Sequence, residues 1–580
     1  MPPKRKDAKI PPPSSPAPPH PAPAPPAPPS PARRSPLRLL VLLGRIVLCA
    51  AALVILWKRI HPTPTTVDLA QDPNRLTYQP IRLDQPKRDA VLDAFKYSYK
   101  AYERDAFGFD DYHPVSHHGT NMSPASGPIG YFIIDSLDSL WITGMMDEYN
   151  KARDWVEGLS FELDDKFHTF EITIRVLGGL LSAYHLSGET DTMLLDKAVD
   201  LADRLLPAFE TPSGLPTSFV NLAKRVGIPD PDNHGLTSVA EAGTLQLELK
   251  YLSELTGNPI YWQKAAKVMR VIGAASSKDG LVPIFLRPDT GQFVPSDIRL
   301  GSRGDSYYEY LSKQYLQTNR TEPVFKEMHD EAMGGIKRHL LKMSHGGLWY
   351  TNELMPRRRR DTGEFELVEI PKQDHLVCFL PASLLLGTTL AQSPLPPDES
   401  AFDERQTDDW FAGKELLRTC VDTYVRSKTG LAPEIVNFHR TAAAARKEGR
   451  EWFINSRARA APNPPIDARN ILRPETVESL FVAFRLTGDP IYREWGWTIF
   501  QAFVKHCRLP DGGFASILDV DQVPVKYEDR METFWISETL KYLYLLFSGP
   551  DVLPLDRYVF NTEAHPLPVF TPTVVEVGLE

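Results

Sequence analysis

The sequence predicts an all-α domain that is built from repeated helical hairpins, carries small β-hairpin insertions and follows a single transmembrane helix. Helical patterns recur in pairs that start near Gly178, Leu245 and Val477, and the first helix of each pair ends at Thr-Gly or Ser-Gly. An apolar run of 19 residues occupies 39–57. With 42% hydrophobic and 24% charged residues, the 580-residue chain has the composition of a protein with a large core.

The amino-terminal part of the chain predicts a tail and a membrane anchor. Residues 1–38 are rich in Pro and Ala, so we expect a disordered tail. Residues 39–57 (LLVLLGRIVLCAAALVILW) have about the length that crosses a hydrocarbon layer, and Arg45 is their one charge. Basic residues precede this run, which places the tail in the cytosol and the remainder in the lumen. A cleaved signal peptide is the alternative, but its apolar region would be shorter.

The remainder of the chain divides by composition. Residues 58–88 are rich in Pro and polar side chains and are expected to form a stem, 89–570 the folded domain and 571–580 a tail. Helical pairs over so long a stretch are typical of either an open solenoid or a closed ring of hairpins. A closed ring would enclose a central cavity that can seclude a reaction.

Several segments interrupt the helical pattern. GLWYTNEL from Gly347 and FELVEI from Phe365 flank the turn RRRRDTG, which predicts a β-hairpin. Residues 391–408 and 439–465 are expected to be surface loops.

Charge and cysteine content exclude some functions. The net charge of −9 and the pI near 6.0 provide no basic field for nucleic acid. Four cysteines in so long a chain exclude a disulfide-dense scaffold, and the absence of a CxxC pair argues against a zinc ribbon or a thioredoxin-like site. Two glycosylation sequons, at Asn121 and Asn319, suit a secretory-pathway lumen.

Acidic residues stand inside otherwise apolar helical patterns, where a charge is costly unless it is paired or used. Glu171 and Arg175 are four residues apart and can pair on one helical face; an ordinary surface ion pair is the alternative reading. Asp305 follows GSRG before an aromatic run, where a plain helix N-cap would also explain it. Glu475 and Glu478 follow Pro474 on one helical face, and their mutual repulsion suggests a cation or a sugar between them.

Together these acids predict more than each does alone. Glu538 lies close to Phe534, a combination of acid and aromatic ring that occurs in sugar subsites and also in ordinary interfaces. A ring of hairpins would bring the starts of its helices to one end of a cavity. Carboxylates in such a cavity are the groups that glycosidic hydrolysis requires, because one protonates the leaving oxygen and another activates water.

Seven segments in order resemble glycoside hydrolase family 47, the class I α-1,2-mannosidases. They are IIDSLDSLWITGM, FEITIRVLGGLLSAYHLSG, GSRGDSYYEYL, HLVCFLP, LRPETVESLF, ETLKYLYLLFSGP and YVFNTEAHP, which together extend over nearly the whole lumenal part. The resemblance implies an (α/α)7 barrel closed at one end by a β-hairpin, and inverting hydrolysis of α-1,2-linked mannose on high-mannose N-glycans.

The resemblance also implies roles for residues. Glu475 looks like the general base and Glu171 like the acid acting through a bridging water, while Asp305 is also implicated in proton transfer. Thr562 in FNTEAHP matches the residue that holds a calcium ion directly, with water and sugar hydroxyls completing its shell. No EF-hand pattern would have predicted this site.

Other positions match the family's substrate pocket and its disulfide. Arg175, Arg303, His375, Glu478, Phe534 and Glu538 resemble substrate-pocket residues, Phe534 stacking on the sugar ring. Cys378 and Cys420 match the structural disulfide, which leaves Cys49 and Cys507 unpaired. An arginine at the position of Arg303 is typical of the family's endoplasmic-reticulum members, which tend to remove one mannose. We therefore expect a single-pass protein of the reticulum membrane. Residence in the Golgi is the alternative.

Two other functions remain open from the sequence. A glycan-binding quality-control protein of the same superfamily would bind high-mannose glycans with little turnover, although Glu171, Asp305, Glu475 and Thr562 are all retained. A membrane-tethered helical-repeat scaffold would also show the repeats, but it would not need this set of acids.

Overall fold

The computed structural model describes residues 79–276, 278–392, 396–455 and 465–574. The predicted tail 1–38, the predicted span 39–57 and most of the expected stem lie outside these residues. In the described part of the chain, no helix combines the length and the apolar character that a membrane crossing requires. The first helix of the described residues, α2, begins at Gln85, inside the range expected for the stem.

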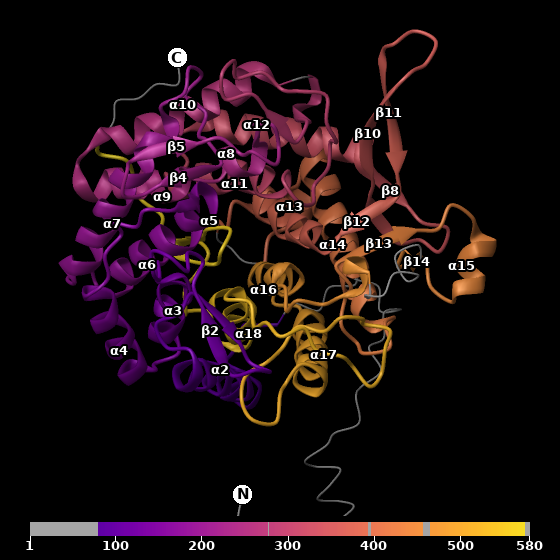
Figure 1. Ribbon diagram of the computed structural model, residues 1–580. Coiled ribbons are helices and arrows are strands. Elements are labelled where there is room, and N and C mark those ends of the chain that lie inside the picture. The colour runs from indigo at the N-terminus through magenta and orange to yellow at the C-terminus, as the bar shows by residue number, and fades with distance from the viewer. Residues whose placement is uncertain (1–78, 277, 393–395, 456–464, 575–580) are drawn as a thin grey trace, which may run out of the picture. The chain divides into compact units, whose positions relative to one another are not determined.

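The fold is dominated by helices in two layers (Figure 1). The inner helices are α3 (Tyr131–Ile142), α6 (Gly178–Leu186), α9 (Gln246–Thr256), α11 (Asp305–Gln317), α13 (Leu380–Thr389), α16 (Glu475–Thr487) and α18 (Leu540–Phe547). The outer helices, each packed on one inner helix in the same order, are α4 (Met146–Glu157), α7 (Thr192–Leu205), α10 (Pro259–Ala275), α12 (Pro323–Gly335), α14 (Glu404–Val425), α17 (Pro490–His506) and α2 (Gln85–Asp105).

The inner helices of the described residues form a closed ring. Each of them contacts the next in chain order, and α18 together with the π-helical turn before it, η9 (Trp535–Thr539), returns to α3. Helix α2, from the start of the fold, packs on α18 at its end, as the indigo and yellow ribbons show in Figure 1. The chain therefore forms a ring of helical hairpins and not an open solenoid.

The predicted helix ends are confirmed at two hairpins. Helix α9 ends at Thr256 and α16 at Thr487, and the following Gly257 and Gly488 are left-handed, with φ of 70° and 69°. A residue with a Cβ adopts this conformation at a cost, so Thr-Gly is an efficient helix stop. The outer helix then starts with a proline in its first turn, at Pro259 or Pro490.

Short antiparallel sheets connect the hairpins. Their strands are β1 (Asp111–His113), β2 (His118–Thr120), β3 (Lys166–His168), β4 (Phe219–Asn221), β5 (Val226–Ile228), β6 (Thr237–Ser238), β7 (Phe285–Leu286), β8 (Leu341–Met343), β9 (Trp349–Thr351), β10 (Glu353–Arg358), β11 (Phe365–Ile370), β12 (Lys372–Asp374), β13 (Ile435–Phe438), β14 (Trp452–Phe453), β15 (Tyr558–Phe560) and β16 (Pro566–Pro568). The remaining named α-helices are α5 (Thr169–Ile172), α8 (Val239–Gly243) and α15 (Ala442–Glu448).

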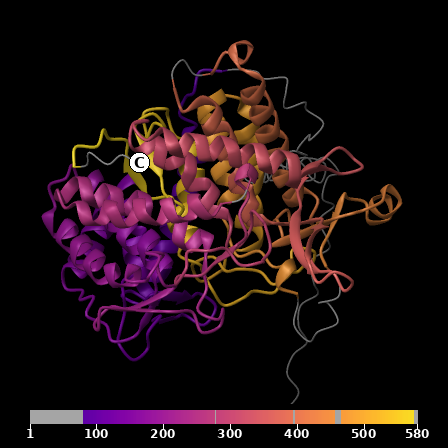
Figure 2. The ribbon, with the colours of Figure 1, turned by 90° about the horizontal axis from the view of Figure 1, so that it is seen from above.

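The interrupting segments follow the predictions in part. Strands β10 and β11 pair with Met355 opposite Val368, which confirms the predicted β-hairpin around the arginine turn. The expectation that 439–465 is only a surface loop is wrong for its first half, because it contains α15 and β14, and Trp452 of β14 is fully buried. Figures 1 and 2 both show the β10–β11 hairpin and α15 standing outside the ring of helices.

One β-hairpin positions residues inside the ring. Strand β15 pairs with β16 and contacts α11, while β16 contacts α6, so the hairpin lies against two inner helices. Its connecting segment, 561–565, is almost entirely buried. The hairpin thus brings Thr562 among side chains from distant helices.

Candidate active site

A cavity of about 320 Å³ lies among the inner helices and collects most of the predicted site residues. Those that line it are Glu171, Arg175, Arg303, Asp305, Glu475, Glu478, Phe534, Glu538 and Thr562. Three of them come from the first turns of α5, α11 and α16. The ring therefore gathers helix starts at one cavity, where the helix dipole favours negative charge.

Glu475, the first residue of α16, is held by groups from both sides. Its Oε2 accepts a hydrogen bond from Nδ1 of His375 at 2.8 Å, and Nη1 of Arg473 lies 3.7 Å from Oε1. Burial opposes ionisation of Glu475, but the hydrogen bond from His375 and the charge of Arg473 outweigh it and lower the pKa. Glu475 is thus an ionised carboxylate that can accept a proton.

Asp305 has the opposite electrostatic character. It is the first residue of α11, after the cap residue Gly304, so the prediction that Asp305 itself is the N-cap is wrong by one position. Its Oδ1 accepts from the backbone N–H of Ser306 at 2.9 Å. Burial, with added repulsion from Glu309 and Glu475, raises the pKa of Asp305 to about 7. Asp305 can therefore hold and donate a proton near neutral pH.

Glu171 and Arg175 form the predicted ion pair, but not on the surface. Nε of Arg175 donates to Oε2 of Glu171 at 2.9 Å, and the hydroxyl of Tyr131 lies 3.2 Å from the same oxygen. Arg175 is only 9% exposed and lies in the π-helical turn η1 (Thr173–Leu177), a distortion that is frequent at functional sites. Burial opposes ionisation of Glu171, yet Arg175 and His168 lower its pKa.

The floor of the cavity is strongly acidic around Thr562. Oγ1 of Thr562 donates to Oε2 of Glu309 at 2.8 Å, and Nζ of Lys313 contacts Glu309 at 2.5 Å and Glu478 at 3.5 Å. Burial and the repulsion of neighbouring carboxylates raise the pKa of Glu478 to about 8 and that of Glu538 well above its usual range. The raised pKa values mean that this floor holds more carboxyl groups than its own cations can keep ionised.

A hard divalent cation suits this surplus of carboxyl groups. Calcium takes six to eight oxygen ligands, and the Thr562 hydroxyl and the nearby carboxylates are oxygen donors of that kind. Within the described ranges, no three His, Cys, Asp or Glu side chains converge as a direct metal-binding group. Thr562 and the nearby carboxylates are the residues that would hold such an ion.

Comparisons with known proteins agree with this geometry. The family profile described as Glycosyl hydrolase family 47 matches residues 94–569. The chain belongs to glycosyl hydrolase family 47. It is accordingly a glycoside hydrolase, and the resemblance seen in the sequence is confirmed.

Individual relatives of this family match most of the chain. A mannosyl-oligosaccharide 1,2-alpha-mannosidase of Candida albicans is 45% identical over 84% of this chain and 84% of its own length. An endoplasmic reticulum mannosyl-oligosaccharide 1,2-alpha-mannosidase of Schizosaccharomyces pombe is 44% identical over 85% of this chain and 91% of its own length. The structure of an alpha-1,2-mannosidase from Trichoderma reesei superposes with a TM-score of 0.73, at 28% identity over 84% of this chain and 100% of that one.

His375 is the predicted site residue that this family-47 cavity does not include. The resemblance implied a substrate-pocket residue, but His375 is buried behind Glu475 and does not line the cavity. Its Nε2 lies 2.9 Å from the hydroxyl of Tyr424 and 3.1 Å from Oγ1 of Thr476. In this structure His375 therefore orients Glu475 from the side away from the cavity.

The remaining predicted residues, Arg303 and Phe534, also line the cavity. Nη1 of Arg303 lies 3.7 Å from Oε1 of Glu241, and its guanidinium lies 5.2 Å from the ring of Phe285. The guanidinium groups of Arg175 and Arg473 are each 5.8 Å from the ring of Phe534. Phe534 is thus a buried aromatic surface close to two cations.

Sequence reasoning missed several lining residues. The ionisable ones are His168, Glu241, Glu309, Arg473 and Glu563. Glu309 is one turn after Asp305, and Arg473 comes directly before the motif PETVE, so both positions could have been found from their neighbours. Glu241 is the last residue of the capping-box pattern Ser-Val-Ala-Glu, which marks a helix start, but its approach to His168 had no local signal because it depends on the packing of α5 against α8.

The cysteines pair as the resemblance implied. Cys378 and Cys420 form a disulfide, with their Cα atoms 6.0 Å apart, while Cys507 is buried and free. Cys49 lies outside the described residues. The sequon residue Asn319 is exposed and Asn121 is half-buried.

Proposed function

We propose that this protein removes terminal α-1,2-linked mannose from high-mannose N-glycans by calcium-dependent, inverting hydrolysis. The observation that carries the proposal is the pairing, in one cavity, of an ionised Glu475 with an Asp305 that holds its proton near neutral pH. Groups whose environments push their pKa values apart are suited to act as base and acid in one reaction. The substrate class is that of the relatives from Candida albicans and Schizosaccharomyces pombe, both mannosyl-oligosaccharide 1,2-alpha-mannosidases by name.

The reaction needs one proton acceptor and one donor. Glu475 takes a proton from water as the water oxygen bonds to C1 of the terminal mannose. Asp305 gives its proton to the glycosidic oxygen as the bond between that oxygen and C1 breaks. Attack from the face opposite the leaving group converts an α-linkage into β-mannose.

Glu171 has a role that differs from the one implied by the resemblance. Arg175 and His168 keep the Glu171 carboxylate ionised, so Asp305 is the better proton source in this structure. An ionised Glu171 beside Arg175 can hold the leaving-group side of the sugar and the water around it. Positive charge that develops at C1 is also stabilised by nearby carboxylates.

Phe534 and Arg303 are suited to position the glycan. The Phe534 ring provides an apolar face for the sugar, and Arg303 at the rim offers donors to hydroxyls of the next residues. Arg303 is 34% exposed on its side chain, as a residue that meets an incoming substrate should be.

Calcium would be held by Thr562 with the carboxylates of Glu309, Glu478 and Glu538 around it. When bound, the ion supplies a fixed positive charge that orders sugar hydroxyls and polarises oxygen. The residues themselves then hold the sugar ring in register with Glu475 and Asp305.

The proposed cellular site follows from the relatives and the sequence. The Schizosaccharomyces pombe relative is named as an endoplasmic reticulum enzyme. An anchor at 39–57 would place the catalytic domain in the lumen of the reticulum as a single-pass membrane protein. Trimming of a nine-mannose glycan to an eight-mannose isomer is the expected reaction there.

The test is to incubate the purified full-length chain with a nine-mannose N-glycan, in calcium and after chelation, and to follow the released anomer by NMR. Initial release of β-mannose that stops on chelation and in Glu475→Gln supports the proposal. Release of α-mannose would contradict inversion. Glycan binding without turnover would mean that the protein is a glycan-binding quality-control homologue.

A further inference from the structure

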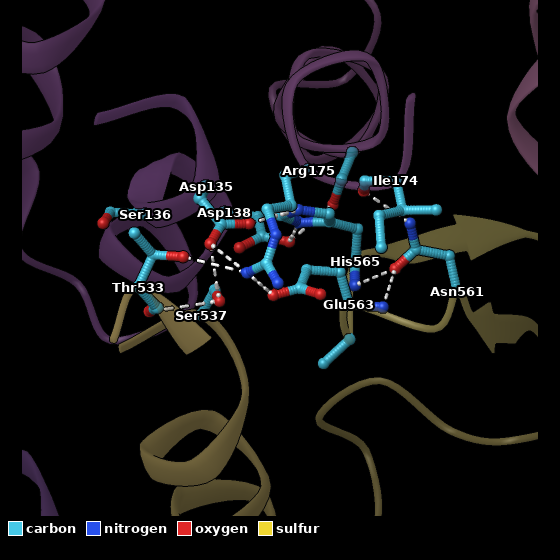
Figure 3. Close-up of polar contacts among 12 residues, drawn as sticks. Asp135, Ser136, Asp138, Ile174, Arg175, Thr533, Ser537, Asn561, Glu563 and His565 are labelled. Carbon is cyan, nitrogen blue, oxygen red and sulfur yellow. Dashed lines mark hydrogen bonds and ion pairs between the residues drawn. The ribbon is translucent and has the colours of Figure 1, made fainter. Parts of the chain in front are cut away.

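A charged cluster is buried beside the cavity and takes no part in lining it. It consists of Asp135 and Asp138 on α3, Lys541 on α18 and His565 after the Thr562 turn, and each side chain is at most 1% exposed. Figure 3 shows His565 beside the two aspartates. Such charges are costly to bury unless each has a partner, so their arrangement is informative.

His565 bridges the two aspartates. Its Nδ1 lies 2.8 Å from Oδ2 of Asp138 and its Nε2 lies 3.1 Å from Oδ1 of Asp135. Ionised carboxylates only accept hydrogen bonds, so both ring nitrogens must carry protons. Burial opposes protonation of His565, but Asp138 and Asp135 outweigh it and raise the pKa of His565 to about 9. The raised pKa agrees with a doubly protonated ring. The ring is thus fixed at both ends.

The two aspartates differ in what lies beyond them. Asp138 also accepts from Nζ of Lys541 at 2.8 Å and from the hydroxyl of Ser182 at 3.0 Å, both of which are buried structural contacts. Asp135 instead contacts Arg175, which lines the cavity. Its Oδ2 lies 3.6 Å from Nη1 of Arg175 and accepts from the hydroxyl of Ser537 at 3.0 Å.

Arg175 carries the contact to the site. Its Nη1 donates to Thr533 at 2.9 Å and also contacts Glu563, while its Nε donates to Glu171 at 2.9 Å. Nη1 of Arg175 is therefore shared by Thr533, Glu563 and, at 3.6 Å, Asp135, and a rotation of Asp135 would change the balance of charges that holds the guanidinium beside Glu171. Figure 3 shows Arg175 among Asp135, Thr533 and Glu563.

We propose that His565 is a positioning residue, which holds Asp135 and through it Arg175 and Glu171 in the arrangement that the reaction requires. The inference rests on the proposed function for the role of Glu171. Lys541 fixes the other aspartate and belongs to the structural half of the cluster. A displacement of about 1 Å at a reacting group can lower a rate by about 100-fold, so loss of the bridge should be visible in catalysis.

The test compares two variants of the full-length chain, each with one substitution at a buried position of the cluster. His565→Leu removes the bridge to Asp135, whereas the matched control Lys541→Met removes a charge from the same cluster but leaves Asp135 in contact with His565. We expect kcat to fall about 10- to 100-fold in His565→Leu with little change in KM. Lys541→Met should lower the melting temperature while it leaves kcat close to the original value.

Further measurements separate positioning from loss of fold. His565→Gln keeps N–H donors and should recover part of kcat, and it replaces His565→Leu if that variant does not fold. Equal losses of kcat in His565→Leu and Lys541→Met, in proportion to lost stability, would overturn the proposal. Crystal structures of both variants supply a readout that needs no turnover, because only the His565 variant should separate Arg175 Nε from Glu171 Oε2. If Arg175 keeps its position in the His565→Leu structure, the positioning role of His565 is refuted. This result does not depend on whether the protein catalyses the proposed reaction.

Discussion

Replacement of His375 by leucine tests the assignment of Glu475 as the base. His375 donates one hydrogen bond of 2.8 Å to the Glu475 carboxylate from the side away from the cavity. Leucine has a similar size and cannot donate. The substitution therefore changes the environment of Glu475 while the cavity lining stays the same.

The size of the effect follows from that bond. A hydrogen bond to a charged group contributes about 1.5–3 kcal/mol, and one pKa unit corresponds to about 1.36 kcal/mol, so the pKa of Glu475 should rise by about one to two units. The sign is set by the folded state, in which the hydrogen bond from His375 and the charge of Arg473 hold the Glu475 pKa down. Glu475 must be ionised to act as the base. In His375→Leu its higher pKa should therefore reduce activity at the low-pH end of the profile.

The assay is the pH dependence of kcat/KM for a mannose-terminated glycan. In His375→Leu the acid limb should move upward by about one to two pH units. Tyr424→Phe is the matched control, since it removes a partner of His375 Nε2 while Thr476 remains 3.1 Å from the same nitrogen. An acid limb that stays in place in His375→Leu, or that moves equally in Tyr424→Phe, would refute the role of this bond.

Three further predictions follow from the site and the disulfide. Asp305→Asn should lower kcat by about 10²–10⁴-fold and abolish the alkaline limb that a pKa of about 7 predicts; a pH profile that retains this limb would contradict the assignment. Calcium at 100 times its Kd should stabilise the fold by about 2.7 kcal/mol in thermal unfolding, and Thr562→Val should lose most of this gain; equal stabilisation of both proteins would contradict the Thr562 site. The double substitution Cys378→Ser and Cys420→Ser opens a loop with a sequence separation of 42, so it should cost about 4 kcal/mol in denaturant unfolding, and an unchanged midpoint would refute this.

The sequence by itself determined the helical hairpins. Thr256-Gly257 and Thr487-Gly488 end their helices because a left-handed residue after the last turn favours glycine, and this requirement is local. The β10–β11 hairpin was also predictable from strand patterns around a turn. The motifs that carry the family resemblance are long local segments, and the family profile confirmed them.

Only the tertiary structure decided what each charged residue does. Asp305 and Glu475 each begin a helix, and nothing local distinguishes their pKa values. Their difference arises because Glu475 receives His375 and Arg473, whereas Asp305 faces other carboxylates in a buried site.

The same reason explains which residues were misplaced or missed. His375 matched a pocket motif, but its position behind Glu475 depends on how the segment before α13 packs against α16. His565 and Asp135 are 430 residues apart and meet only because the ring of helices closes. Sequence patterns fix the local backbone, while burial and charge pairing between distant segments fix the chemistry of the site.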